Sequence, residues 1–136
     1  MKIMVDLNIL VDVLQHRVPF FLPSAKVCDA IKAGRCEGLV AAHAVTTLYY
    51  LIRRCADKAA AEKALDWLLS TFDIASADKA VVVAARLLNV DDFEDAVVSA
   101  SAVARSCDYI VTRNLGDYRN SPVAALAPEE FLQIRE

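Results

Sequence analysis

The stretch that decides the fold lies at the start of the chain, where residues 3–8 read IMVDLN. A short run of apolar residues is typical of a strand that is buried on both faces, as in a parallel sheet. The aspartate that follows this run, Asp6, would lie just beyond the carboxyl end of the strand. Open α/β sheets bind their ligands at this edge. The stretch therefore predicts a buried parallel strand that delivers a carboxylate to a binding crevice.

Two later segments also place acids where a strand gives way to a helix or loop, residues 91–96 (DDFEDA) and residues 109–118 (YIVTRNLGDY). Converging carboxylates make the all-oxygen site that Mg²⁺ or Mn²⁺ prefers. A divalent cation relieves their repulsion, lowers the pKa of a bound water and polarises a phosphoryl oxygen. Taken singly, Asp92 is explained as well by helix capping and Asp117 by a solvated turn. The three segments together favour metal-assisted phosphate chemistry.

Strands and helices are expected to alternate along the chain. Strands are expected at residues 2–5, 38–41, 73–75, 109–112 and 123–126, and helices at 8–15, 23–33, 44–55, 58–70, 78–88, 93–105 and from 128 onward. This alternation predicts an α/β fold with a mostly parallel sheet between helices, a three-layer α/β/α sandwich. A length of 136 residues suits a single domain, residues 1–136.

Composition narrows the class of protein. The chain is 57% hydrophobic with a net charge of −3, which argues against an extended basic surface for nucleic acid. It has no uncharged apolar run of about 18 residues, so no membrane span is expected, and no secretory signal is recognised. The four cysteines lack zinc-site spacing and are expected to be buried in a reducing compartment. We therefore expect a cytoplasmic protein.

Polar residues beside the third acidic segment have two interpretations. Thr112 and Asn114 could orient a carboxylate or a metal-bound water, and Arg113 could contact phosphate. An ordinary turn explains the same residues equally well. Arg53 belongs to a small basic cluster that is usually a solvated helix end, with an RNA-backbone contact as the weaker interpretation.

Taken together, these segments resemble the PIN-domain family over essentially the whole chain. The stretches that carry the resemblance are residues 5–12 (VDLNILVD), 48–54 (LYYLIRR), 92–96 (DFEDA), 110–114 (IVTRN) and 117–118 (DY). Their order and spacing are more specific than any one of them. Many members of this family are the ribonuclease toxins of VapC-type toxin–antitoxin pairs.

The resemblance implies an α/β/α sandwich that cleaves single-stranded RNA with a water activated by Mg²⁺ or Mn²⁺. Asp6, Asp95 and Asp117 match the acidic catalytic and metal-binding positions. Asn8 and Thr112 match supporting polar positions, and Asn114 stands where the family often has aspartate. A small antitoxin protein is an implied partner. A homodimer is expected because the helices at 48–54 and 58–70 offer apolar surface beyond one core.

One residue departs from the family pattern. The acidic residue that usually precedes the Leu-Tyr-Tyr segment is replaced by Thr47, whose hydroxyl carries no charge. Asp92 or Glu94 could compensate. The alternative is a PIN-like domain with weakened catalysis that serves as an RNA-binding or protein-binding module. An α/β phosphotransfer or phosphatase domain ranks last, because no Asp-x-Asp with a downstream lysine occurs in the expected form.

Overall fold

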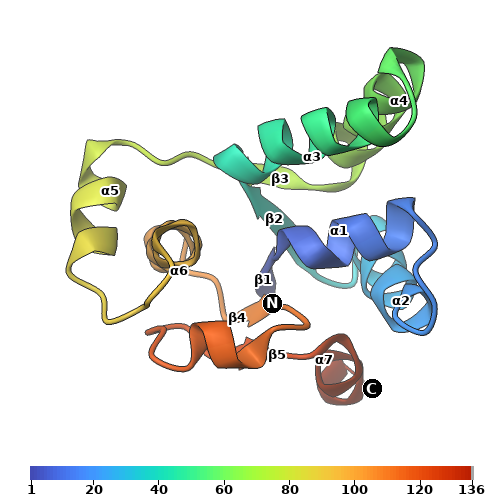
Figure 1. Cartoon of the computed structure of the whole chain (residues 1–136). Coiled ribbons are helices and arrows are strands. Elements are labelled where there is room, and N and C mark those ends of the chain that lie inside the picture. The colour runs from blue at the N-terminus through green and yellow to red at the C-terminus, as the bar shows by residue number, and fades with distance from the viewer. Residues whose placement is uncertain (136) are drawn as a thin grey trace.

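In the described chain, five parallel strands form one sheet in the order β3-β2-β1-β4-β5, with helices on both of its faces (Figure 1). The structure is a computed structural model and describes residues 1–135. The strands are β1 (Lys2–Val5), β2 (Glu37–Ala41), β3 (Asp73–Ala75), β4 (Tyr109–Val111) and β5 (Ala125–Leu126). The helices are α1 (Leu7–Leu14), α2 (Phe21–Lys32), α3 (Ala42–Cys55), α4 (Lys58–Thr71), α5 (Lys79–Arg86), α6 (Phe93–Ala104) and α7 (Pro128–Arg135), with a short 3-10 helix η1 (Leu115–Tyr118). This arrangement confirms the expected α/β/α sandwich.

The central strand β1 sends alternate side chains to the two faces of the sheet. Ile3 and Val5 join a core formed with α1, α2, α3, α4 and α7. Met4 joins the opposite core, which includes residues of α6 and η1. All three side chains are almost fully buried. The period of two is that of a strand, and burial on both faces explains why the strand reads as an unbroken apolar run.

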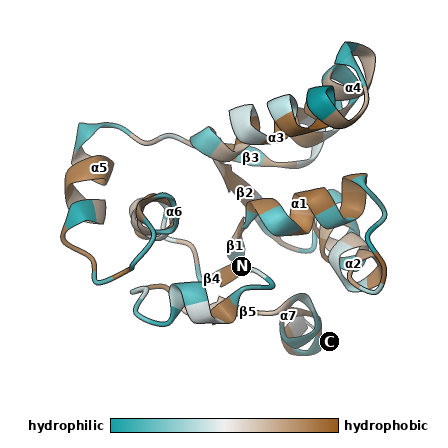
Figure 2. Ribbon diagram, viewed as in Figure 1, coloured by the Kyte–Doolittle hydropathy of each residue, from teal (hydrophilic) through white to brown (hydrophobic). Residues whose placement is uncertain are grey.

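Helix α1 is apolar along most of its length (Figure 2). It packs against α2 and α3, and Ile9, Leu10 and Val11 are buried. Asp12 is buried in the same helix, with 0% of its surface exposed. Because α2 and α3 pack against α1, the orientation of this helix is fixed. The position of Asp6, which precedes its first turn, is fixed with it.

The start of α2 and the extent of β5 differ in detail from the expectation. Helix α2 begins at Phe21, so Pro23 lies within its first turn, where a missing N–H costs no helical bond. Gly34, at φ 76°, lies just beyond the C-cap Ala33, as expected of a helix stop. Strand β5 covers only Ala125–Leu126, because the N–H of Val123 bonds the Oγ of Ser121 at 3.2 Å in a turn.

Strand β1 lies where the order of the sheet reverses. It pairs with β2 on one side and with β4 on the other. The chain adds β2 and β3 on the first side and later adds β4 and β5 on the opposite side. Crevices at such switch points, beyond the carboxyl ends of the strands, are where open α/β sheets bind ligands. Over residues 1–135, the helices are too short or too polar to cross a membrane.

Candidate active site

Asp6 is held at the switch point by four hydrogen bonds. Its backbone N–H donates to the carbonyl of Val111 at 3.0 Å, which ties it to β4. Its Oδ1 accepts the N–H of Leu7 at 2.8 Å, so Asp6 is the N-cap of α1. Its Oδ2 accepts the hydroxyl of Thr112 at 2.8 Å and the Nδ2 of Asn8 at 3.2 Å. The carboxylate is therefore oriented by both strands that flank the crevice.

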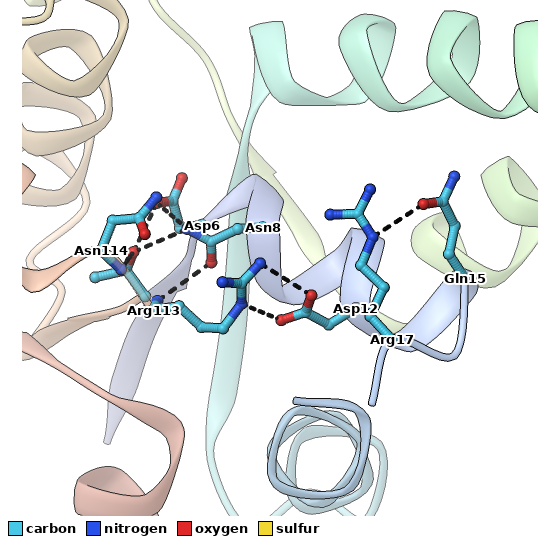
Figure 3. Close-up of polar contacts among 8 residues, drawn as sticks. Asp6, Asn8, Asp12, Gln15, Arg17, Arg113 and Asn114 are labelled. Atoms are coloured by element: carbon cyan, nitrogen blue, oxygen red, sulfur yellow. Dashed lines mark hydrogen bonds and ion pairs between the residues drawn. The ribbon is translucent and has the colours of Figure 1, made fainter. Parts of the chain in front are cut away.

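Asn8 and Thr112 connect this carboxylate to the loop after β4 (Figure 3). Asn8 Nδ2 also lies 3.2 Å from Thr112 Oγ1, and Asn8 Oδ1 accepts the backbone N–H of Arg113 at 3.3 Å. Thr112 is completely buried and also accepts the N–H of Asn114 at 3.0 Å. Both residues lie against Asp6, where a supporting role was predicted for them.

A pocket of about 200 Å³ opens at this edge of the sheet. The residues predicted for the site that line it are Asp6, Asn8, Thr47, Asp95, Asn114 and Asp117. The three predicted acids thus come from three distant segments into one crevice. Asn114 and Asp117 both line it, so the structure does not separate the two candidates from the loop after β4.

Burial, and to a smaller extent like charges, disfavours the ionised carboxylates of this pocket. Burial raises the pKa of Asp6, with a small further rise from Asp117, against the lowering effect of its hydrogen bonds. Burial, together with the charges of Asp6, Asp92 and Asp117, raises the pKa of Asp95 to about 6. Within residues 1–135, the ion pairs of the chain involve other acids. A cation bound in the pocket would therefore relieve the repulsion between these carboxylates, which no ion pair within residues 1–135 offsets.

Tyr118 is a member of the site that sequence reasoning missed. Its side chain is 3% exposed, and its hydroxyl donates to Asp95 Oδ1 at 3.2 Å. Burial and the charges of Asp6 and Asp95 raise the pKa of Tyr118 well above its ordinary value, so it stays a neutral donor. In the sequence it resembles an ordinary core aromatic, and nothing there indicated a hydroxyl turned toward carboxylates.

Asp92, predicted as a supporting residue, and Arg53, predicted as a nucleic-acid contact, lie outside the pocket lining, as do Thr112 and Arg113. Asp92 is the N-cap of α6 and accepts the N–H of Asp95 at 3.1 Å, the structural explanation considered for it from sequence. Its charge still reaches Asp95 and raises the pKa of that group. Arg53 is exposed in the last turn of α3. Its RNA contact stays a prediction.

Arg113 forms an ion pair with the buried Asp12 (Figure 3). Its Nε donates to Asp12 Oδ2 at 2.5 Å and its Nη2 to Asp12 Oδ1 at 3.1 Å. Its guanidinium carbon lies 4.0 Å from the centre of the Phe20 ring. The structure thus gives Arg113 an intramolecular partner that sequence reasoning did not foresee, and its phosphate contact stays a prediction.

The wall contributed by α3 carries no carboxylate. Thr47 lines the pocket, and its hydroxyl donates to the carbonyl of His43 one turn earlier, at 3.1 Å. His43 and Glu94 line the pocket as well. The spacing of four residues between His43 and Thr47 places them on one helix face, a signal that could have identified His43 from the sequence.

The donors around the pocket suit a hydrated hard cation. They are mainly carboxylate, amide and hydroxyl oxygens, the ligands that Mg²⁺ and Mn²⁺ prefer. Across the described chain, no three His, Cys, Asp or Glu side chains are close enough together to enclose a metal ion. Mg²⁺ usually keeps several waters and is held by one or two carboxylates. The residues present therefore fit a cation that retains waters better than one in a closed protein cage.

Comparison with known proteins gives this site a family. The model of the PIN domain matches residues 2–116, while no curated protein sequence matches significantly. Among solved structures, VapBC2 from Rickettsia felis, bound to a DNA fragment from its promoter, is similar with a TM-score of 0.73, 16% identity and coverage of 93% of this chain and 98% of that chain. DNA-bound VapBC from Salmonella typhimurium is similar with a TM-score of 0.74 and 12% identity, and the match covers 94% of this chain and 98% of that chain.

The sarcin-ricin loop cleaving toxin VapC20 from Mycobacterium tuberculosis has the same fold, with a TM-score of 0.64, 14% identity and coverage of 79% of this chain and 86% of that chain. At these identities the likeness is one of fold. The family match covers most of the chain and includes the segments of Asp6 and Asp95 and the strand before Asp117. The chain belongs to the PIN-domain family.

Proposed function

We propose that the protein is a metal-dependent endoribonuclease that cleaves single-stranded RNA as the toxin of a toxin–antitoxin pair. The observation that carries the proposal is that Asp6, Asp95 and Asp117 meet in one pocket, with no ion pair to a basic side chain among residues 1–135. Membership of the PIN-domain family supports a nuclease. The similarity to VapBC structures supports the assignment as a toxin.

In this proposal Asp6, Asp95 and Asp117 would hold Mg²⁺ or Mn²⁺ together with waters that the cation retains, because no three acidic side chains of the described residues are close enough to enclose it alone. The cation, when bound, supplies an activated water and polarises the phosphoryl oxygen. The chain contributes orientation: Thr112 and Asn8 fix the Asp6 carboxylate in advance, which limits its reorganisation on binding. Tyr118 donates a hydrogen bond to Asp95 and bears no charge of its own.

The test compares Asp95→Asn with Asp91→Asn, an exposed acid of the same segment that does not line the pocket. We expect wild type and Asp91→Asn to cleave a labelled single-stranded RNA in Mn²⁺, with Asp95→Asn slower by more than about 100-fold, the upper range for residues that only support a metal ligand. Calorimetric titration with Mn²⁺ measures binding separately. Equal Mn²⁺ binding by wild type and Asp95→Asn would refute the role assigned to Asp95.

A second candidate function rests on Thr47. Because this wall residue is uncharged, the site lacks the carboxylate that the family places there, unless Glu94, which also lines the pocket, replaces it as a ligand. Ligand charge count tunes cation affinity in oxygen sites. The chain would then be an RNA-binding or protein-binding module with weak or absent cleavage. RNA binding without Mn²⁺-dependent cleavage under any condition tested would favour this candidate over the ribonuclease.

The proposed partners are RNA, a small antitoxin and a second copy of the chain. Exposed Tyr50 on α3 and Leu69 on α4, at 63% and 56%, offer apolar surface for an isologous dimer. Light scattering across a concentration series tests this, and a strict monomer at high micromolar concentration would contradict it. All four cysteines are free, which suits the reducing cytoplasm where we place the activity.

A further inference from the structure

We propose that a second pocket, beside the candidate active site, binds a base of the RNA substrate, with guanine preferred. This inference rests on the proposed ribonuclease function. The pocket measures about 270 Å³, and its lining includes Phe20, Pro23, Ser24, Arg113, Pro128 and Glu129. We call it the base pocket.

Arg113 connects the base pocket to the acidic site. Its backbone N–H is bonded to Asn8 Oδ1 at 3.3 Å, and Asn8 in turn donates to Asp6. Its side chain turns away from Asp6 toward Asp12 and Phe20 and lines the base pocket. Consecutive residues of the loop after β4 therefore line the two pockets, Arg113 the base pocket and Asn114 the acidic one, and we expect an RNA strand with a phosphate at Asp6 to place a neighbouring base at Phe20.

The shape and polarity of the base pocket suit a flat, uncharged ring. Phe20 is 41% exposed, and proline rings supply further apolar wall. Aromatic side chains stack on bases of single-stranded RNA, and a planar guanidinium adds to such a stack. Glu129 places a carboxylate in the lining, which repels a phosphate and accepts N–H donors from a base. These features favour a base over the sugar–phosphate backbone.

Two polar groups of the lining have hydrogen-bonding capacity left over. The Ser24 hydroxyl is completely buried and has no hydrogen-bond partner among the described residues. Buried polar groups are nearly always bonded, so a ligand atom is a reasonable partner for it. Arg113 bonds Asp12 through Nε and Nη2. Across residues 1–135, its Nη1 makes no hydrogen bond or ion pair, so it is free to meet an acceptor on a base.

Guanine matches this combination of groups. Its Watson–Crick edge offers adjacent N–H donors that one carboxylate can accept together, and its O6 accepts from arginine. Adenine presents a single amino donor on that edge and lacks O6. We therefore expect Glu129 to set the preference and Phe20 to supply most of the affinity.

The test is fluorescence anisotropy with single-stranded uridine oligomers that carry one central guanine or one central adenine, in EDTA to prevent cleavage. Phe20→Ala should weaken binding of the guanine oligomer about tenfold, within the range for loss of one base stack, whereas Phe20→Tyr should retain it. Glu129→Gln should reduce the preference for guanine over adenine. Leu22→Ala is the matched control, because Leu22 is 60% exposed in the same turn and lies outside the lining.

Thermal unfolding of each variant establishes that it is folded. Equal affinity of folded Phe20→Ala and wild type would overturn the base pocket and leave the proposed ribonuclease standing, provided that wild type binds RNA. Absence of binding of the guanine oligomer by folded wild type would also overturn the base pocket, whereas the proposed ribonuclease is tested separately by cleavage in Mn²⁺. A guanine preference that survives Glu129→Gln would overturn the assignment of Glu129.

Discussion

Acidic residues have basic partners at the amino edge of the sheet, whereas at the carboxyl edge they lie near one another. At the amino edge, Asp73 accepts a bond from Arg105 at 2.5 Å, and Glu37 lies 3.9 Å from the ammonium of Lys2. A hollow of about 910 Å³ lies there, but these acids have basic partners in its lining. At the carboxyl edge, Asp6 and Asp95 face other carboxylates.

The difference appears in the proton affinities of two aspartates. Hydrogen bonding to Arg105 lowers the pKa of Asp73, whereas burial and neighbouring carboxylates raise the pKa of Asp95 to about 6. Paired acids at one edge serve stability, and unpaired acids at the other oppose it. Such uncompensated groups in a cleft are typical of functional sites. The contrast between the edges therefore locates chemistry better than cavity size does.

The largest effect is expected from removing Arg113, which forms an ion pair with a buried acid near the carboxyl edge. Arg113→Ala leaves the fully buried Asp12 without a partner. We expect a loss of about 3 kcal/mol or more in the free energy of unfolding, as for other broken buried pairs. Urea denaturation at pH 7 measures it. Asp12→Leu combined with Arg113→Met should recover much of the loss, and a double variant no more stable than Arg113→Ala would contradict this explanation.

A carboxylate added to the crevice should make the contrast between the edges stronger. Thr47→Glu should raise Mn²⁺ affinity about tenfold by adding ligand charge, and RNA cleavage should rise with it. Calorimetry and a cleavage assay provide the measurements. Thr47→Val removes only the hydroxyl bonded to the His43 carbonyl and should change neither quantity. If folded Thr47→Glu binds Mn²⁺ no better than wild type, Thr47 does not face the cation.

The raised pKa of Asp95 predicts a pH-dependent penalty in metal-free protein. As pH rises from about 4 to about 6, the unfolded chain releases this proton before the folded chain does, so stability falls. Asp95→Asn should therefore be more stable than wild type at pH 7, by on the order of 1 kcal/mol after solvent screening. The gain should vanish near pH 4. Urea denaturation at both pH values tests this, and a gain of equal size at both would exclude the titration as its cause.

The smallest effect is expected at the amino edge. Asp73→Asn breaks an exposed pair with Arg105, and exposed pairs contribute about 0.2–1 kcal/mol. Because the pKa of Asp73 is lowered, its contribution is present at neutral pH and disappears on acidification. Denaturation at low and high salt should show the loss shrinking as salt rises. A loss larger than that of Arg113→Ala would reverse the ranking of the two pairs.

The sequence predicted the parts of the site that depend on strand ends. An apolar run followed by Asp6 is enough to place that acid, because parallel strands end at a common edge. The partner of Asp12 could not be predicted in this way, since Arg113 lies 101 residues away and no periodicity connects them. Tyr118 was missed for a similar reason, because only the folded chain turns its hydroxyl toward Asp95. Asp92 is the opposite case, because its capping of α6 depends only on neighbouring residues and could be considered from the sequence.

The central position of β1 has a consequence for synthesis of the protein. Residues 2–5 are translated well before one neighbour of this strand, β4, which lies more than 100 residues later. Asp6 is held from this side by the hydroxyl of Thr112 and by the backbone carbonyl of Val111. A nascent chain that stops before them has Asp6 with its local donors Leu7 and Asn8, but without the contacts from β4 and its loop. The full set of hydrogen bonds around Asp6 therefore cannot form before residues 111 and 112 have been translated.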